Sequence, residues 1–386
     1  MTACPSCFEQ VPVDHYTWIC KSGKCVANPD PVASAYLGAT VNSGPITEVK
    51  RPADATRKWG PPTVAHCSQC GQAASEVCPI CHYSLLPDWR LADVTTIAMN
   101  GARATGKSFY IAVAIHQLRQ LLVHLRTTVE FANDHTRDTY KKVYEAPLFE
   151  QLGLIAPTPR SDTDNSYQRE PMIFSIGMLK GRNRFIAMRD VAGEEMEKAS
   201  AEAANLSFLR HADSVFFMFD PLAIPEIRDR LSDLLPQQLH QGGDPRVVLG
   251  NFLRLLKGAT PRVAIVVSKF DAMQALREVN DPEWKTIMSN PGAAFMRDSS
   301  LDSGSYDHAD GELLSLEIES LLHNLGASNF VLSLEQGAGG KSIPHRFFAI
   351  SALGASTEGE SLSKYGISPF RILDPLKWIL DARGVI

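Results

Sequence analysis

Apolar residues in this chain gather in short runs, and the segments between several of these runs have helical spacing. Runs at residues 94–99, 215–219, 263–267 and 347–350 have the length of buried strands. Apolar residues three and four positions apart at 111–118 and 312–325 favour helices. Strands that alternate with helices in this way predict an α/β domain with a mostly parallel sheet and helices on both faces.

The other patterned segments extend this domain. We expect short strands at 128–131 and 329–334, a β-hairpin from 172–179 and 184–188, and helices at 134–145 and 375–382. Asn133 or Asp134 would cap the helix at 134–145. Residues 297–311 are rich in Ser, Asp and Gly and are expected to form a mobile loop.

The first strand leads into a phosphate-binding sequence. Residues 101–108 read G-A-R-A-T-G-K-S and precede a helical pattern. Gly101 and Gly106 let backbone N–H groups converge on a phosphate at a helix N-terminus, whose dipole favours anions. Lys107 would reach the β- and γ-phosphates, and Ser108 would ligate Mg²⁺. The spacing therefore predicts a nucleoside-triphosphate site rather than an ordinary glycine-rich turn.

A D-x-x-G sequence follows the second hairpin strand. The carboxylate of Asp190 could hold a water of the Mg²⁺ shell, and the N–H of Gly193 could reach a γ-phosphate. The polar loop at 156–166 lies where a nucleotide switch would carry a threonine that senses the γ-phosphate through Mg²⁺. Thr158 and Thr163 are both candidates, and we favour Thr158.

A base-reading loop is indicated after the strand at 263–267, which ends in Ser268-Lys269-Phe270-Asp271. The carboxylate of Asp271 could accept both the N1 and the N2 protons of guanine, whereas adenine offers no such pair of donors. Guanine is therefore the expected base. A solvated turn at the strand end is the alternative.

All eight cysteines lie in the first 81 residues. In sequence order they form two groups of four: Cys4, Cys7, Cys20 and Cys25, followed by Cys67, Cys70, Cys78 and Cys81. Thiolate pairs two to four residues apart can hold one tetrahedral ion from two turns, so we predict a structural zinc site in each group. His15 could replace a ligand of the first group. Disulfides are the alternative, which a reducing cytosol disfavours.

Composition and charge indicate the class of protein and its cellular location. The 386 residues are 44% hydrophobic with a net charge of -5. We expect a cysteine-rich zinc-binding region at 1–88, with an extended Pro-rich connection at 26–66, and a nucleotide domain at 89–386. Absence of a leader or a long apolar run predicts a cytoplasmic protein without a membrane span. Residues 1–88 contain six Lys or Arg and seven Asp or Glu, which favours contact with a protein, or simple stapling of a small module that lacks its own core, over nucleic-acid binding.

Four motifs taken together resemble those of a known family. Residues 101–108, 190–193, 268–271 and 351–352 are similar in order and position to the motifs of Ras-like P-loop GTPases of the translation-factor class, over residues 91–386. The cysteine groups and the long segments around the switch resemble the bacterial double-GTPase proteins of conflict systems. The resemblance implies a three-layer P-loop GTPase domain that binds GTP and GDP with Mg²⁺ and works with a protein partner or a second GTPase.

The resemblance also implies roles for individual residues. Contacts with the nucleotide would come from Gly101, Arg103, Ala104, Thr105, Gly106, Lys107, Ser108, Phe109, Lys269, Asp271, Ser351, Ala352 and Leu353. Hydrolysis would involve Lys107, Thr158, Asp190, Gly193 and Glu194, with Ser108, Thr158 and Asp190 around Mg²⁺. Lys269 would pack along the base, and the Ala352 N–H would contact the guanine oxygen.

Two positions depart from the family pattern. Ser268 stands where the family usually has Asn or Thr, which weakens the expected base binding. Glu194 stands where Ras-like members have a water-orienting Gln, so turnover should be slow or need a partner. Two other functions therefore stay open: a zinc-ribbon interaction protein whose nucleotide domain hydrolyses poorly, and a P-loop ATPase of another class.

Overall fold

The structure is a computed structural model that describes residues 2–386 except for a few segments. The segments outside the described residues are 57–58, 62–63, 157–169, 232–242, 279, 300–302, 338–339, 356–361 and 363–365. Both candidate switch threonines, Thr158 and Thr163, lie outside the described residues.

A seven-stranded sheet forms the centre of the larger part of the chain, in the order β12-β11-β10-β6-β9-β8-β7. The five strands from β12 to β9 are parallel, and β8 and β7 are antiparallel to their neighbours. This arrangement confirms the α/β class with a mostly parallel sheet. The strands are β6 (Asp93–Asn100), β7 (Glu130–Phe131), β8 (Met172–Leu179), β9 (Arg182–Asp190), β10 (Ser214–Phe219), β11 (Arg262–Val267) and β12 (His345–Ala349).

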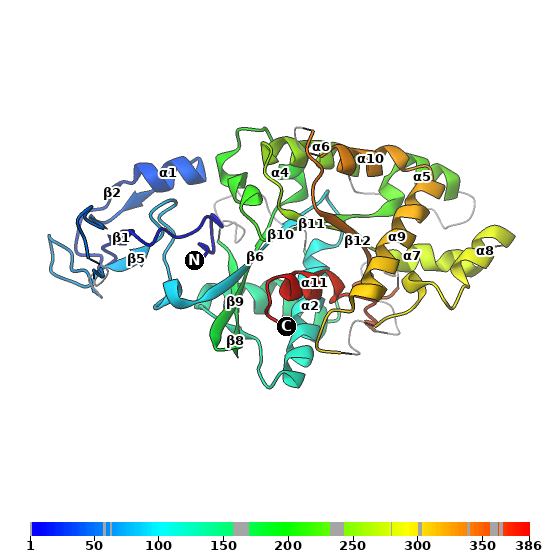
Figure 1. The fold of residues 1–386 in the computed structure, drawn as a ribbon, viewed down its shortest axis with the longest axis horizontal. Coiled ribbons are helices and arrows are strands. Elements are labelled where there is room, and N and C mark those ends of the chain that lie inside the picture. Colours follow the sequence, from blue (N-terminus) through cyan, green and yellow to red (C-terminus); the bar gives the residue numbers. More distant parts are fainter. Residues whose placement is uncertain are drawn as a thin grey trace.

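Helices cover both faces of this sheet, with α6 and α10 on one side of β10–β12 and α2 and α11 on the other (Figure 1). Strand β10 is buried at every position because it lies between these layers. The helices are α2 (Lys107–His124), α3 (Asp134–Thr139), α4 (Gly193–Glu197), α5 (Pro225–Leu231), α6 (Pro245–Leu256), α7 (Phe270–Gln274), α8 (Pro282–Met288), α9 (His308–Asn324), α10 (Ser328–Gln336) and α11 (Asp374–Ala382). No helix in the described part of the chain combines the length and apolar character needed to cross a membrane.

Short 3₁₀ segments and one π-helical segment connect these elements. The 3₁₀ segments are η1 (Trp89–Leu91), η4 (Ala204–Arg210), η5 (Pro221–Ala223), η6 (Ala275–Glu278) and η7 (Ala294–Met296). The π-helical segment η2 (Tyr140–Glu150) continues α3, so the helix expected at 134–145 changes its hydrogen-bonding pattern after Thr139 and reaches Glu150. Asn133 is the cap, since its side chain accepts a hydrogen bond from the Thr136 N–H at 2.7 Å.

One strand prediction was wrong. Residues 329–334 lie in helix α10 rather than in a strand. Their buried side chains, Phe330, Val331 and Leu334, have the i, i+1, i+4 spacing of one helix face. The apolar run is too short to distinguish the two-residue period of a strand from the 3.6-residue period of a helix. By contrast, the hairpin expected at 172–188 is confirmed as the antiparallel pair β8 and β9.

The N-terminal part is a second, smaller arrangement around a three-stranded antiparallel sheet, β4-β1-β5. Its elements are β1 (His15–Ile19), β2 (Asn28–Pro29), α1 (Pro31–Leu37), β3 (Asn42–Ser43), β4 (Ile46–Lys50) and β5 (Ser75–Val77). The extended connection expected at 26–66 is therefore wrong for residues 28–50. Asp30 caps α1, accepting from Val32 N and Ala33 N, and β4 pairs with β1 along its whole length.

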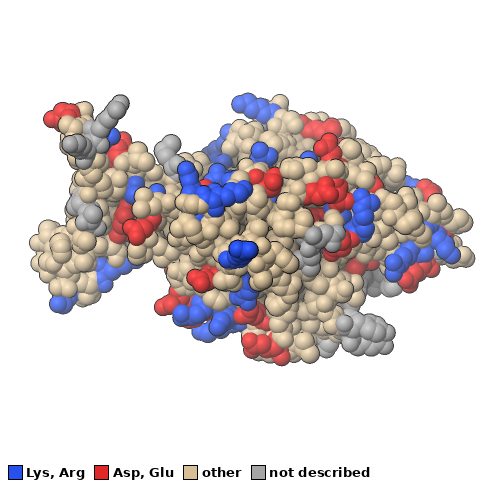
Figure 2. Space-filling model, turned by 60° about the horizontal axis from the view of Figure 1, so that its bottom comes forward, with Lys and Arg blue, Asp and Glu red and all other residues tan. Residues whose placement is uncertain are grey.

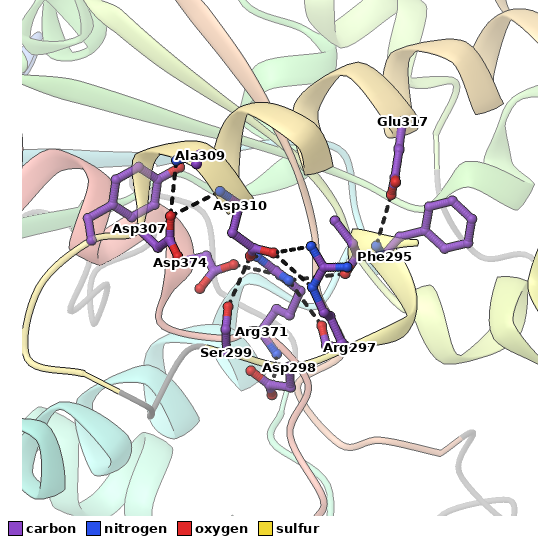
Figure 3. A network of polar contacts seen from close by, with 12 residues as sticks. Phe295, Arg297, Asp298, Ser299, Asp307, Ala309, Asp310, Glu317, Arg371 and Asp374 are labelled. Atoms are coloured by element: carbon purple, nitrogen blue, oxygen red, sulfur yellow. Dashed lines mark hydrogen bonds and ion pairs between the residues drawn. The ribbon is translucent and has the colours of Figure 1, made fainter. Parts of the chain in front are cut away.

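Part of the loop expected to be mobile at 297–311 is held by a buried arginine (Figure 3). Arg371 forms ion pairs with Asp310 and with Asp374, and its Nη1 donates to the carbonyl oxygens of Ala294 and Arg297, both at 3.0 Å. Burial raises the pKa of Asp374 to about 6, against the opposing effect of Arg371. The network fixes the segment before α9 onto the start of α11.

Candidate nucleotide and metal sites

The phosphate-binding sequence forms a tight loop between β6 and α2. Gly101, Ala104 and Gly106 have φ angles of 144°, 58° and 84°, so three positions of the loop have the positive φ that a tight turn requires. Lys107 is buried, and its Nζ donates to the carbonyl oxygens of Gly101 at 2.8 Å and Ala102 at 2.9 Å. The lysine ammonium therefore lies over the loop, where a phosphate-binding charge is required.

Two glycines allow close backbone approaches around this loop. A Cβ on Gly101 would lie 2.1 Å from the Met218 carbonyl oxygen of β10, and a Cβ on Gly193 would lie 2.3 Å from the Arg103 N. Neither position has room for a side chain. The start of α4, which carries the D-x-x-G glycine, is thereby packed against the backbone of the phosphate loop.

Asp190 lies beside the phosphate loop because β6 and β9 run parallel. Asp190 pairs in register with Met99, at the carboxyl ends of both strands, and is buried. Burial lowers the pKa of Lys107, while the nearby carboxylates of Asp190 and Glu197 oppose this shift. Lys107 and Asp190, which are 83 positions apart in the chain, thus belong to one electrostatic site.

The carboxylates of α4 contact the phosphate loop in two ways. Glu194 pairs with the Arg103 guanidinium at 3.1 Å, and both side chains are substantially exposed. Glu197 was not predicted as a site residue, yet its Oε1 accepts a hydrogen bond from the Arg103 backbone N–H at 3.3 Å. The Glu197 carboxylate therefore accepts a hydrogen bond from a backbone N–H group that the sequence predicts to bind phosphate.

The predicted base-reading residues meet at the ends of β11 and β12. Ser351 Oγ donates to Asp271 Oδ1 at 2.6 Å, and the Gly354 N–H donates to Ser351 Oγ at 2.9 Å. Ser351 also exchanges backbone hydrogen bonds with Phe370, next to the buried Arg371. Ala352 and Leu353 follow, half-buried against the core. The arrangement holds one oxygen of the Asp271 carboxylate in a fixed direction.

Ser268 and Lys269 make contacts that the sequence did not reveal. Ser268 Oγ donates to the Phe219 carbonyl oxygen at 2.9 Å, so it joins β11 to β10 rather than binding a side chain. Lys269 Nζ lies 2.9 Å from Oδ2 of Asp220, which follows β10. The Asp220-Pro221 step marks the end of a strand in the sequence, but only the parallel pairing of β10 and β11 brings Asp220 to Lys269.

The prediction that the cysteines group in sequence order was wrong. The structure brings together Cys4, Cys7, Cys78 and Cys81 in one cluster and Cys20, Cys25, Cys67 and Cys70 in another. All eight cysteines, each among the described residues, are free thiols, which contradicts the disulfide alternative. His15 belongs to neither cluster, and its Nε2 lies 3.5 Å from Glu48.

Antiparallel strand pairing explains the interleaved clusters. β1 pairs with β5 so that Ile19 faces Ser75 and Thr17 faces Val77. The end of β1, with Cys20, therefore lies beside the chain that enters β5 from Cys70. The end of β5, with Cys78, lies beside the chain that enters β1 from the N-terminus. Each cluster thus combines one early and one late cysteine pair.

Both clusters have the dimensions of a tetrahedral thiolate site. The four sulfur atoms of each cluster lie within 4.8 Å of one another, and the closest pairs, Cys4–Cys81 and Cys20–Cys70, are 3.6 Å apart. Zinc–sulfur bonds of about 2.3 Å require sulfur–sulfur edges of about 3.8 Å. Phe8, Gly71 and His82, which follow the C-x2-C pairs, have φ angles of 61°, 67° and 58° that close each turn. Both clusters could hold zinc.

The sheet topology, the phosphate loop and the D-x-x-G turn define a P-loop nucleotide-binding fold. The chain belongs to the Double-GTPase 2 family, whose sequence model matches residues 95–315. This is a GTPase family, so the sequence resemblance to P-loop GTPases is confirmed.

Individual proteins are similar to this chain to different degrees. The "Putative ESX-1 scaffolding and assembly protein SaeC" of Mycolicibacterium smegmatis (strain ATCC 700084 / mc(2)155) is 42% identical over 388 residues, covering 100% of both chains. Among solved structures, a bacterial selenocysteine-specific elongation factor and the GTP-bound GTPase-like domain of S. cerevisiae Ski7 are each 12% identical. Their TM-scores are 0.29 and 0.33, and the matches cover 75% of this chain but 29% and 50% of theirs.

Proposed function

We propose that this protein is a molecular switch that binds GTP and hydrolyses it to GDP and phosphate. The observation that carries the proposal is the placement of Lys107, Asp190 and the Asp271–Ser351 pair. They lie at the carboxyl ends of β6, β9, β11 and β12, which are parallel strands of one sheet. Ligands of open parallel sheets bind at this edge.

Each part of this edge has a proposed task. The loop at 101–108 would bind the phosphates through its amides and Lys107, with Phe109 in the first turn of α2 below it. Ser108 and Asp190 would hold Mg²⁺, which neutralises phosphate charge when bound. Asp271 would read guanine, and Thr158 would report the γ-phosphate. Water would attack the γ-phosphate in line with the leaving oxygen.

The contact between Glu197 and the Arg103 N–H suggests how the switch responds to the triphosphate. A carboxylate and a γ-phosphate are both anions and cannot share one amide without repulsion. GTP would therefore displace the Glu197 side chain from this amide, whereas GDP, which lacks the γ-phosphate, would leave the contact in place. The position of the Glu197 side chain would then depend on which nucleotide is bound, while Asn251 Nδ2, which donates to the carbonyl oxygens of Met196 and Glu197, holds the end of the α4 backbone.

A scaffolding role with protein partners is the second part of the proposal. It is supported by the similarity to SaeC, which is named a scaffolding and assembly protein, and by the surface charge. On the face shown in Figure 2, basic and acidic side chains are interspersed, without the basic stripe that nucleic-acid binding favours. We propose a cytoplasmic assembly protein whose N-terminal zinc module contacts a protein partner, which could be a second GTPase.

Single-turnover hydrolysis tests the enzymatic part. With excess protein and Mg²⁺, we expect GTP to be cleaved slowly, on the order of 10⁻³ s⁻¹ or below, because Glu194 is held by Arg103 rather than placed as a neutral water-orienting amide. A chelator of Mg²⁺ should abolish the reaction. Bound GTP that stays intact over many hours would favour an interaction protein with a nucleotide domain that does not hydrolyse, and faster cleavage of ATP would favour an ATPase.

A further inference from the structure

The first cysteine cluster contacts the strand that carries Asp190. Ser6 lies between the ligand candidates Cys4 and Cys7, and its carbonyl oxygen accepts a hydrogen bond from Arg189 Nη1 at 2.9 Å. The same carbonyl accepts from the Tyr36 hydroxyl at 3.0 Å, and that hydroxyl accepts from Arg189 Nη1 at 2.6 Å. Only 5% of Arg189 is exposed. The Cys4–Cys7 turn, which we call the knuckle, is thus joined to the end of β9 by largely buried hydrogen bonds from the charged Arg189 side chain.

An aromatic contact repeats this connection. The Arg189 guanidinium lies 3.9 Å from the centroid of the Phe208 ring, and Phe8, directly after Cys7, packs edge-on against the same ring at 5.3 Å. Phe8 and Phe208 are almost completely buried. Because the guanidinium stacks on Phe208 and donates through Nη1 to the Ser6 carbonyl oxygen, a shift of the Cys4–Cys7 turn is transmitted to Arg189.

The side chains beside Arg189 leave a cavity. A cavity of about 80 Å³ separates Thr40 and Val41, after α1, from Asp190 and Glu195. Arg189 and Phe208 line the same cavity. Val191 and Ala192, which follow Asp190, are buried, and Gly193 packs against the Arg103 backbone, so the end of β9 is connected closely to the phosphate loop.

We propose that Arg189 is a positioning residue through which the Cys4–Cys7–Cys78–Cys81 site holds Asp190 for nucleotide binding. This inference rests on the proposed function and adds to it that metal in this cluster and GTP at the phosphate loop stabilise each other. Such coupling is reciprocal, because a metal that favours the GTP-bound geometry must be bound more tightly when GTP is present.

The test uses the full chain with Arg189→Gln, and Arg184→Gln as a matched control. Arg184 is a second buried arginine of β9, which pairs with Asp93 at the opposite end of the strand. We expect Arg189→Gln to retain zinc and to lose about tenfold in Mg²⁺-dependent GTP affinity, with a smaller loss for GDP. Arg184→Gln should keep the wild-type ratio of GTP to GDP affinity, even if its melting temperature falls as much as that of Arg189→Gln.

Zinc release provides the second readout. In the Cys20→Ser/Cys67→Ser variant, which retains only the Cys4 cluster, transfer of zinc to a chelator should be slower with a non-hydrolysable GTP analogue than with GDP. Adding Arg189→Gln should remove this difference. A wild-type ratio of GTP to GDP affinity in Arg189→Gln, or a rate of zinc release that is the same with either nucleotide, would overturn this inference but not the proposed function. Wild-type protein that binds no GTP would overturn the proposed function as well.

Discussion

Replacing Lys107 with alanine is expected to lower the affinity for GTP by about 100-fold, the largest effect of any single change at the nucleotide site. The ammonium is buried over the phosphate loop, where it donates to two carbonyl oxygens, and it would donate to phosphate oxygens in the same place. Two charge-assisted hydrogen bonds of about 1.5 kcal/mol each amount to about 3 kcal/mol, which corresponds to this change.

The sequence supplies a matched control for this variant. Gly340-Lys341-Ser342 repeats the end of the phosphate-loop sequence, but Lys341 is exposed and Glu335 occupies the position of the first glycine. Calorimetric titration with Mg²⁺ and GTP should therefore give wild-type affinity for Lys341→Ala. Unchanged GTP affinity in a folded Lys107→Ala protein would show that the nucleotide does not bind at this loop.

Paired cysteine substitutions are expected to separate the interleaved clusters from the sequence-order groups. Cys4→Ser/Cys78→Ser removes two ligands from one cluster and leaves the other intact, so one zinc equivalent should resist a chelator. Cys4→Ser/Cys20→Ser leaves three thiolates in each cluster, so no chelator-resistant zinc should remain. The loss is large because a structural zinc contributes about 10–16 kcal/mol of binding free energy that also stabilises the fold.

Elemental analysis after chelator treatment measures both variants, and the wild-type protein should retain two equivalents. If sequence order governed the groups, the two results would be exchanged, because Cys4 would then share a site with Cys20 and not with Cys78. Iron in place of zinc would keep the clusters but change the metal, and the same analysis identifies it. The unfolding temperature should fall in both variants, since the Cys4 cluster is continuous with the core around Trp89.

The nucleotide domain was largely predictable from the sequence because its signals are local. A phosphate loop needs particular residues at fixed spacing, and the strand before it and the helix after it are long enough to show their periods. Asp190 and Asp271 follow strands whose carboxyl ends meet at one edge of a parallel sheet. Their proximity to Lys107 and Ser351 respectively therefore follows from topology alone.

The cysteine clusters were not predictable in the same way, because strand pairing decides them. Spacing within the three C-x2-C pairs and the one C-x4-C pair predicted the four pairs correctly, but which pairs meet depends on the antiparallel register of β1 with β5. Similarly, the contacts of Asp220 with Lys269 and of Glu197 with the Arg103 N–H join residues 49 and 94 positions apart. Carboxylates on a strand end or a short helix give no sequence signal of such partners.

Guanine recognition by Asp271 distinguishes the GTPase account from the ATPase alternative. Ser351 donates to Oδ1 of Asp271, which leaves the second carboxylate oxygen directed away from Ser351. In Asp271→Asn, the amide oxygen can keep the Ser351 hydrogen bond, so the amide NH₂ would face the base. A donor would then oppose the N1–H and N2–H₂ donors of guanine. Xanthine has a carbonyl in place of the amino group and could accept from this amide.

Competition binding of GTP, ATP and XTP to the wild-type protein and to Asp271→Asn tests the central claim most directly. Asp281→Asn serves as the control, because Asp281 caps α8, a role that asparagine also fills. We predict that the wild-type protein and the control prefer GTP. Asp271→Asn should lose about 2 kcal/mol of GTP binding, about 30-fold in affinity, and prefer XTP. A wild-type preference for ATP, or an Asp271→Asn variant with unaltered preference, would contradict the account.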